Sequence, residues 1–317
     1  MTPTLLPFRL RPQYRNYVWG GNRLKSSAKP VAEAWIVHES DAVVLGAWRG
    51  RSLKEVASEL GGRLLGSAVV AQGTATRFPL LIKLLDCAEW LSLQVHPNDE
   101  QAVALEGQGY YGKTEAWFVL DAAKDARLIA GVKPGTDAGK LQAAIRDGSV
   151  IEACQYHAVK AGETIFVEPG TLHALGPGLL IYEVQQSSDL TYRVYDWGRP
   201  QTETRKLHID KSLAVVDAAK SPQAVPVPAF DEGKEQVLCR SRYFTLSCLG
   251  AEKVTTAFDT AGKSFHCLTA IEGSAWVKVK NHKWHLGQYE TLLVPAECGA
   301  YQVVPEHKFK MLKAWVE

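Results

Sequence analysis

Short apolar runs separated by turn residues dominate the first two thirds of the chain and predict β-strands. The strongest runs are rich in Val, Ile, Leu, Tyr and Trp, and they lie at residues 79–85, 91–95, 115–120, 164–167 and 179–184. Glycine, proline and polar residues stand between many of them, as is typical of turns between strands. Many short strands with regular turns favour a barrel or jelly roll over a doubly wound sheet.

Helical periodicity is confined to three segments, at residues 52–60, 136–153 and 206–216. In the first segment, Ser52 followed three residues later by Glu55 is the pattern of a capping box. The second segment has Thr136 or Asp137 as its N-cap, and we expect it to break near Gly148. Helices are therefore expected to be few.

A Pro- and Ala-rich stretch begins at about Ser221 and reads as a linker, and residues 233–317 beyond it are almost entirely strand-like. Two half-repeats, at residues 162–173 and 287–299, each combine a Gly turn, an apolar strand, a proline and a second turn. Both half-repeats resemble the second motif of the cupins.

We therefore predict a mostly β protein made of two cupin-type jelly-roll barrels, with a few helices attached to the N-terminal barrel. Residues 1–232 are expected to form the catalytic, metal-binding domain. Residues 233–317 are expected to form a second cupin-like barrel without metal ligands, because Gly299 stands where the first half-repeat has His173.

Composition limits the class of protein. Charged residues make up 22% of the chain and the net charge is about +2, so neither a nucleic acid nor a membrane surface is an expected partner. Apolar runs are shorter than the roughly 20 residues of a membrane helix, and the first residues do not resemble a signal peptide. The six cysteines are scattered without Cys-x-x-Cys spacing, which indicates free buried thiols and a cytoplasmic location.

Four residues in three segments form a candidate metal site. Gln94 and His96 are two apart on a predicted strand, so both side chains project from the same face. Glu115 opens the next predicted strand, and His173 follows a Gly turn on a later one. Two imidazoles, a carboxylate and an amide oxygen suit Zn²⁺ at a catalytic site that keeps a position open. Mn²⁺, Co²⁺ and Fe²⁺ would also be accepted.

The remaining histidines lack such settings, and we interpret all of them as surface residues: His38, His157, His208, His266, His282, His285 and His307.

The ordered motifs of the chain resemble type I mannose-6-phosphate isomerase (phosphomannose isomerase) in its short bacterial form. The matching stretches lie at residues 19–21, 33–35, 78–85, 91–99, 112–117, 169–176 and 183–197, and their order and spacing agree over most of residues 7–205. The resemblance implies that Gln94, His96, Glu115 and His173 bind one Zn²⁺ per chain. It also implies that the all-helical domain of the longer family members is shortened here.

The same resemblance assigns roles to five further residues. Lys83 and Ser92 fall on the family's phosphate-contacting positions and are the expected substrate-binding residues. Lys113 falls on the family's lysine two residues before the glutamate ligand. Glu183 and Arg193 fall on an acidic residue and an arginine that face the substrate in longer family members, and these three are the expected catalytic residues. The implied reaction interconverts mannose 6-phosphate and fructose 6-phosphate through an enediolate, whose charge a bound Zn²⁺ is suited to stabilise.

The sequence leaves several alternatives open. Glu183, Lys113 or a metal-bound hydroxide could be the general base. Arg193 could stabilise the enediolate or hold the phosphate in a bidentate contact. A cupin that binds a sugar phosphate as a sensor or scaffold, without turnover, is the alternative function. A metal oxygenase is disfavoured, because Gln94 and the basic residues do not fit a His-dominated redox site. The expected partner is a small-molecule sugar phosphate, and the expected state is a monomer or homodimer.

Overall fold

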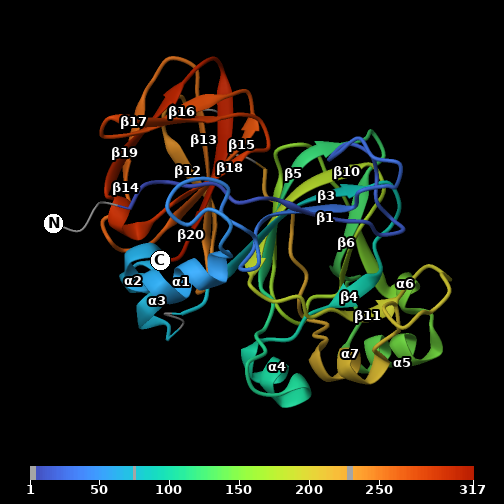
Figure 1. Cartoon of the computed structure of the whole chain (residues 1–317). Coiled ribbons are helices and arrows are strands. Elements are labelled where there is room, and N and C mark those ends of the chain that lie inside the picture. The colour runs from blue at the N-terminus through green and yellow to red at the C-terminus, as the bar shows by residue number, and fades with distance from the viewer. Residues whose placement is uncertain (1–4, 74–75, 227–230) are drawn as a thin grey trace. The chain divides into compact units, whose positions relative to one another are not determined.

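The computed structural model describes residues 5–73, 76–226 and 231–317, and antiparallel strands dominate it (Figure 1). The first sheet has, in spatial order, β1 (Gln13–Arg15), β2 (Glu33–Val37), β3 (Leu80–Cys87), β10 (Leu179–Gln186), β5 (Glu115–Ala122) and β8 (Thr164–Val167). The second has β11 (Tyr192–Tyr195), β4 (Leu93–Val95), β9 (His173–Leu175), β6 (Arg127–Val132) and β7 (Cys154–Ala158). The five strands predicted from apolar runs are confirmed as β3, β4, β5, β8 and β10.

Two further sheets account for most of the C-terminal residues, which confirms their strand-like pattern. The third sheet has β12 (Glu235–Arg240), β13 (Thr245–Ala251), β20 (Phe309–Trp315), β15 (His266–Glu272) and β18 (Thr291–Val294). The fourth has β14 (Thr256–Asp259), β19 (Ala300–Pro305), β16 (Ala275–Val279) and β17 (His282–Leu286). The mostly β prediction is confirmed. Residues 227–230 of the predicted linker lie outside the described part of the chain.

Helices are short and few: α1 (Leu53–Leu60), α2 (Gly62–Leu65), α3 (Ser67–Ala71), α4 (Asp99–Glu106), α5 (Ala138–Asp147), α6 (Val150–Ala153), α7 (Ile209–Val215) and the 3₁₀ helix η1 (Ala296–Cys298). The capping box of Ser52 and Glu55 is present at the start of α1. Asp137 caps α5, and Gly148, at φ 84°, separates α5 from α6 as expected. The third predicted helix is shorter than its pattern, since α7 begins at Ile209. None of the helices in the described residues has the length and apolarity that crossing a membrane requires.

The chain divides into two compact units. One contains Tyr14–Ala34 and Lys83–Pro226, and the other contains Met1–Gln13, Trp35–Ile82 and Val227–Glu317. The expected division at residue 232 placed residues 35–82 in the N-terminal domain, whereas the structure groups them with the C-terminal strands. Helices α1–α3 therefore lie in the unit of the C-terminal strands, where the Ser67 amide donates a hydrogen bond to the Gly262 carbonyl.

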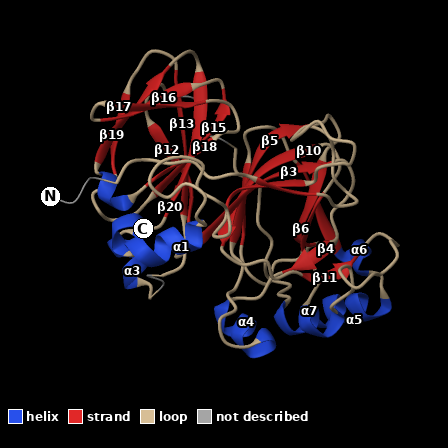
Figure 2. Ribbon diagram, viewed as in Figure 1, coloured by secondary structure: helices blue, strands red, loops and turns tan. Residues whose placement is uncertain are grey.

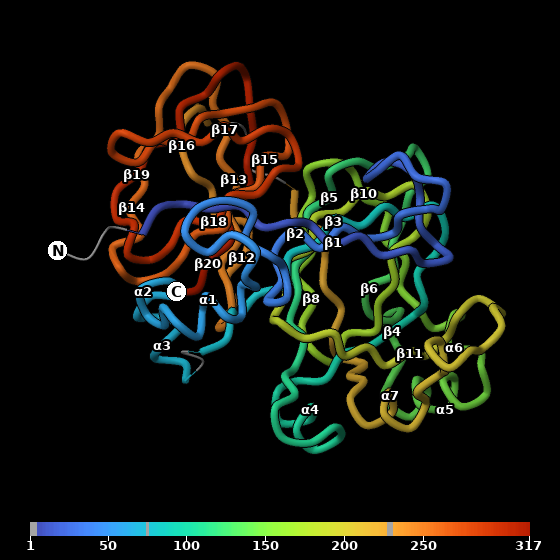
Figure 3. Tube along the Cα trace, viewed as in Figure 1, coloured from blue at the N-terminus to red at the C-terminus, as the bar shows by residue number. Residues whose placement is uncertain are grey.

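The unit with residues 83–226 positions the candidate ligands through strand alternation. On β4, Leu93 and Val95 are fully buried against Leu141 and Ile145 of α5. Figures 2 and 3 show α5 and α7 beside β4 and β11. Since successive side chains of a strand point to opposite faces, Gln94 must point away from these helices. That opposite face carries the candidate site.

A matching strand register in the other unit places His266 where the first unit has Glu115. Glu115, the first residue of β5, pairs with Val167 of β8. His266, the first residue of β15, pairs with Val294 of β18. Strand β8 lies in the first half-repeat identified in the sequence, and strand β18 lies in the second. His266 is only 5% exposed, so its interpretation as a surface residue was wrong.

The thiol prediction is confirmed for the described residues: all six cysteines are free, five are buried and Cys239 is half-buried.

Candidate metal centre and active site

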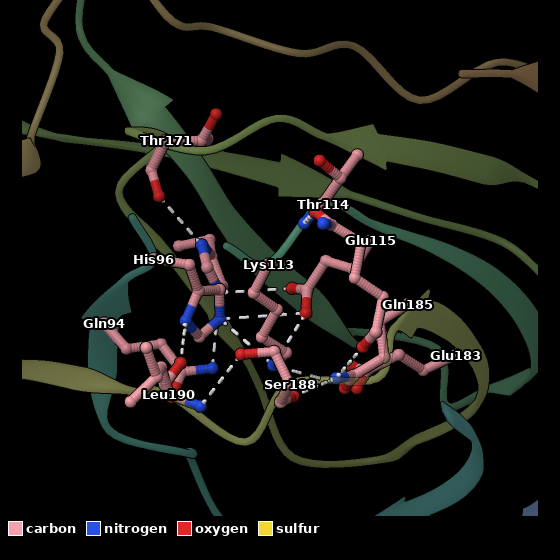
Figure 4. A network of polar contacts seen from close by, with 12 residues as sticks. Gln94, His96, Lys113, Thr114, Glu115, Thr171, Glu183, Gln185, Ser188 and Leu190 are labelled. Atoms are coloured by element: carbon pink, nitrogen blue, oxygen red, sulfur yellow. Dashed lines mark hydrogen bonds and ion pairs between the residues drawn. The ribbon is translucent and has the colours of Figure 1, made fainter. Parts of the chain in front are cut away.

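Three buried side chains converge from three strands, and Figure 4 labels two of them, His96 and Glu115. His96 directly follows β4, Glu115 begins β5 and His173 begins β9. Their potential ligand atoms all lie within 4.8 Å of one another. Gln94 is the register partner of His173, and its Nε2 lies 3.2 Å from Nε2 of that imidazole. The structure therefore brings together all four residues that the sequence suggested as ligands.

Backbone carbonyl groups orient both imidazoles. Nδ1 of His96 lies 2.8 Å from the carbonyl oxygen of Leu190, and Nδ1 of His173 lies 2.8 Å from that of Thr171. A carbonyl oxygen only accepts hydrogen bonds, so each Nδ1 must carry the proton and donate it. Nε2 of each ring then presents its lone pair toward Glu115, at 3.7 and 3.3 Å. This is the tautomer that a metal-binding histidine needs.

Burial makes the cluster costly without a cation. It raises the pKa of Glu115 to about 7, lowers the pKa of His173 to about 4 and lowers that of His96 well below its ordinary value. Both carboxylate oxygens of Glu115 are buried. The Lys113 ammonium lies 2.8 Å from Oε2, whereas Oε1 has no hydrogen-bond partner among the described residues. Neutral imidazoles beside a carboxylate with an unpaired oxygen are the donor set that Zn²⁺ takes, so these residues fit a divalent metal.

Two lysines surround Glu183. The Lys113 ammonium lies 4.0 Å from Oε1 of Glu183 and 2.8 Å from Oε2 of Glu115. The Lys83 ammonium lies 3.4 Å from Oε1 of Glu183 and 3.7 Å from Glu33. Burial alone would raise the pKa of Glu183, but Lys113 and Lys83 outweigh it and hold this pKa below its usual value. Trp117 fixes the carboxylate by donating a 2.9 Å hydrogen bond from Nε1.

A cavity of about 660 Å³ adjoins this network. Six residues selected from the sequence line it: Lys83, Ser92, Gln94, Lys113, Glu183 and Arg193. Arg193 is the register partner of Gln94, which places it on the strand beside the candidate ligands. Burial and the neighbouring Arg205 lower the pKa of Arg193 below its usual value. The cavity thus combines buried ion pairs with a guanidinium that makes no ion pair among the described residues.

Sequence reasoning missed several lining residues. Glu33 lies in a matched motif but was assigned no role. Its Oε2 lies 3.7 Å from the Lys83 ammonium because β2 and β3 are neighbours in one sheet, which the sequence did not reveal. Asp189, Arg205 and His208 also line the cavity. His208 had been interpreted as a surface residue, yet it is half-buried. His208 lies within the segment of residues 206–216 that was predicted as a helix, and that pattern carries no signal for the cavity.

Comparisons with known proteins agree with this arrangement. A family model described as "Phosphomannose isomerase type I, catalytic domain" matches residues 7–115. The chain is 37% identical to the mannose-6-phosphate isomerase of Streptococcus mutans over 309 residues, which cover 93% of this chain and 94% of that protein. It is 36% identical to the mannose-6-phosphate isomerase ManA of Bacillus subtilis, over 95% of this chain and 96% of that protein.

A solved structure is similar over nearly the whole length. The crystal structure of the mannose 6-phosphate isomerase from Bacillus subtilis superposes with a TM-score of 0.83 at 26% identity, and the match covers 98% of this chain and 99% of that one. Near-complete coverage on both sides means that the similarity extends beyond the matched catalytic segment to the C-terminal strands. The chain therefore belongs to the type I phosphomannose isomerase family.

Proposed function

We propose that this chain is a metal-dependent mannose-6-phosphate isomerase, with Zn²⁺ held by Gln94, His96, Glu115 and His173. The observation that carries the proposal is the buried cluster of His96, Glu115 and His173, whose ligand atoms lie within 4.8 Å of one another beside a cavity lined with lysine and arginine. When bound, Zn²⁺ would act as a Lewis acid that polarises the sugar carbonyl.

The catalytic groups are Glu183, Lys113 and Arg193. We assign to Glu183 the removal of the proton from C2, because the two lysines keep its carboxylate ionised and Trp117 fixes its direction. Lys113 lies between the ligand cluster and Glu183, where its ammonium can stabilise negative charge on the adjacent substrate oxygens. Arg193, permanently charged, adds a second cation for the enediolate.

Lys83 and Ser92 are the proposed substrate-binding residues. Ser92 is two residues before Gln94, and both line the cavity, so a substrate contacting one can reach the other. Lys83 is buried among carboxylates, and their attraction outweighs its desolvation and raises its pKa above the ordinary value. Its fixed ammonium can therefore contact a substrate phosphate without changing protonation.

The wider architecture and setting are also proposals. We place the metal centre in a cupin-type jelly-roll barrel formed by the first two sheets, and we assign the last two sheets to a second barrel without metal ligands. The described residues contain one group of three or more His, Cys, Asp or Glu that could hold a metal, and it lies in the first barrel. We further propose a cytoplasmic enzyme, which its free cysteines favour, acting as a monomer or homodimer.

The decisive experiment measures fructose 6-phosphate formation from mannose 6-phosphate. Purified protein is assayed as isolated, after stripping with a chelator, and after resupply of Zn²⁺. We expect activity to vanish on stripping and to return with the metal. A folded, zinc-loaded protein without activity would contradict the proposal and favour a cupin that binds a sugar phosphate without turnover. Light scattering after size exclusion measures the oligomeric state.

A further inference from the structure

The loop of residues 196–208, which follows β11, lines the active-site cavity and holds Arg193. Thr202, Thr204, Arg205 and His208 of this loop all contribute to the cavity wall. Nη1 of Arg193 donates a 3.0 Å hydrogen bond to the carbonyl oxygen of Lys206. Nε of Arg193 is buried and has no hydrogen-bond partner among the described residues. The loop therefore supplies the one hydrogen-bond partner that this guanidinium has among the described residues.

The first limb of the loop, residues 197–199, is anchored to the chain that leads into β4. Trp197 donates from Nε1 to the carbonyl oxygen of Leu91 at 2.6 Å, and its backbone is held at φ 56°, in the left-handed region. Arg199 donates from Nη1 to the carbonyl oxygen of Trp90 at 2.9 Å. Because residues 90 and 91 directly precede Ser92, and Gln94 follows two residues after Ser92, this limb is fixed relative to the candidate ligands.

The second limb of the loop, residues 201–208, is held in place by one carboxylate, that of Asp196. Asp196 accepts two hydrogen bonds from Arg205, from Nε at 2.9 Å and from Nη2 at 2.6 Å, and a third from Arg199 at 3.1 Å. Such paired contacts between a carboxylate and a guanidinium fix geometry as well as charge. Asp196 is 5% exposed, so the pair is shielded from solvent.

Few other contacts hold the second limb. Among the described residues, the other hydrogen bonds of residues 201–206 lie within residues 201–207, apart from the contact of Lys206 with Arg193. The limb ends at His208, whose amide donates to the Arg193 carbonyl at 2.8 Å. Without the ion pair to Asp196, most of the limb would be tethered only at its two ends.

We propose that Asp196 is a positioning residue that closes the 196–208 loop through Arg205 and thereby aims Arg193 at the reacting atoms. Asp196 does not line the cavity, so it acts through its partners and not by touching the substrate. The inference rests on the proposed function of Arg193. It adds the requirement that the 196–208 loop be closed, which none of the ligands or catalytic residues provides.

The first test is a double-mutant cycle of Asp196→Asn and Arg205→Gln. We expect each variant to lower kcat by about 10- to 100-fold with a smaller change in KM, because a misplaced transition-state contact mainly affects kcat. The double variant should lose no more than about twofold beyond Asp196→Asn, since both changes break one ion pair. Additive losses would overturn the proposal.

The control is Glu168→Gln, which removes a 2.9 Å ion pair with Lys220 outside the cavity lining and changes the net charge equally. It should leave kcat unchanged. Metal content and the thermal unfolding midpoint are measured for every variant. If kcat falls only in proportion to lost metal or folded protein, a merely structural role explains the effect and the proposal fails. Should Asp196→Asn not fold, Arg205→Gln and the milder Arg205→Lys break or weaken the same pair.

The second readout does not require turnover. Butanedione modifies accessible guanidinium groups, and peptide mass spectrometry measures its rate of reaction at Arg193. We expect faster modification of Arg193 in Asp196→Asn than in the parent protein or in Glu168→Gln, because the hydrogen bond to Lys206 is released. An unchanged rate would refute the positioning role. If the parent protein proved inactive, this rate would still decide the inference separately from the proposed function.

Discussion

Acid should destabilise this protein through His266, a neutral imidazole in the core of the C-terminal unit. Its Nδ1 lies 2.7 Å from the hydroxyl of Tyr301, and its ring contacts Trp315. Burial, with a smaller contribution from the Lys313 ammonium, lowers the pKa of His266 from 6.5 to about 3. The imidazole therefore stays unprotonated in the folded protein at pH values where an exposed histidine would be charged.

The sign of the effect follows from proton linkage. Between pH 6.5 and 3, the unfolded state binds a proton at this histidine that the folded state does not bind. Stability is therefore fully present above the unfolded pKa and falls as the pH is lowered. At pH 5, the unfolded pKa lies about 1.5 units above the pH, which corresponds to about 2 kcal/mol lost relative to pH 7.

Urea unfolding at pH 7 and pH 5, followed by tryptophan fluorescence, measures this loss. We expect His266→Gln to be less stable than the parent at pH 7, yet to lose about 2 kcal/mol less between the two pH values. His307→Gln, at an exposed histidine, is the control and should behave like the parent. Equal losses in His266→Gln and the parent, or an NMR titration of His266 near 6.5, would refute the reasoning.

Three further predictions concern the active site. His173→Ala should abolish both zinc retention, measured by metal analysis, and turnover; a variant that keeps its zinc would contradict the ligand assignment. Arg193→Ala should keep its zinc but lose kcat by about two orders of magnitude or more, since a charge contact in the transition state is removed. Trp117→Phe removes a hydrogen bond to Glu183 worth about 1.5–3 kcal/mol, so kcat should fall about tenfold or more. The pKa of Glu183 should then rise, which moves the acid limb of the pH–rate profile to higher pH; an unmoved limb would argue against Glu183 as the base.

Local patterns predicted the strands and the candidate ligands because both depend on short-range rules. The alternation of Leu93, Gln94 and Val95 already separates the face against α5 from the face of the site. The capping box at Ser52 and the break at Gly148 also follow from neighbouring residues.

Helix α4 was not predicted because its local pattern is weak: Asn98 accepts a hydrogen bond from the Gln101 amide, but the apolar face that follows is too small to reveal a helix. Features that depend on distant residues could not be predicted from local patterns either. The pairing of Lys83 with Glu33 depends on the order of strands in the sheet. The burial of His266 depends on Tyr301, which is 35 residues away in sequence.

The shared register of Glu115 and His266 has an electrostatic consequence. At equivalent strand positions, the chain carries a carboxylate among potential ligands in one unit and an uncharged imidazole bonded to a phenol in the other. The first position attracts a cation, whereas the second is neutral and already has a hydrogen-bond partner. The two units therefore differ in charge at the same position of the same strand pairing. The unit in which a metal is expected carries a carboxylate there, and the unit in which no metal is expected carries an uncharged side chain.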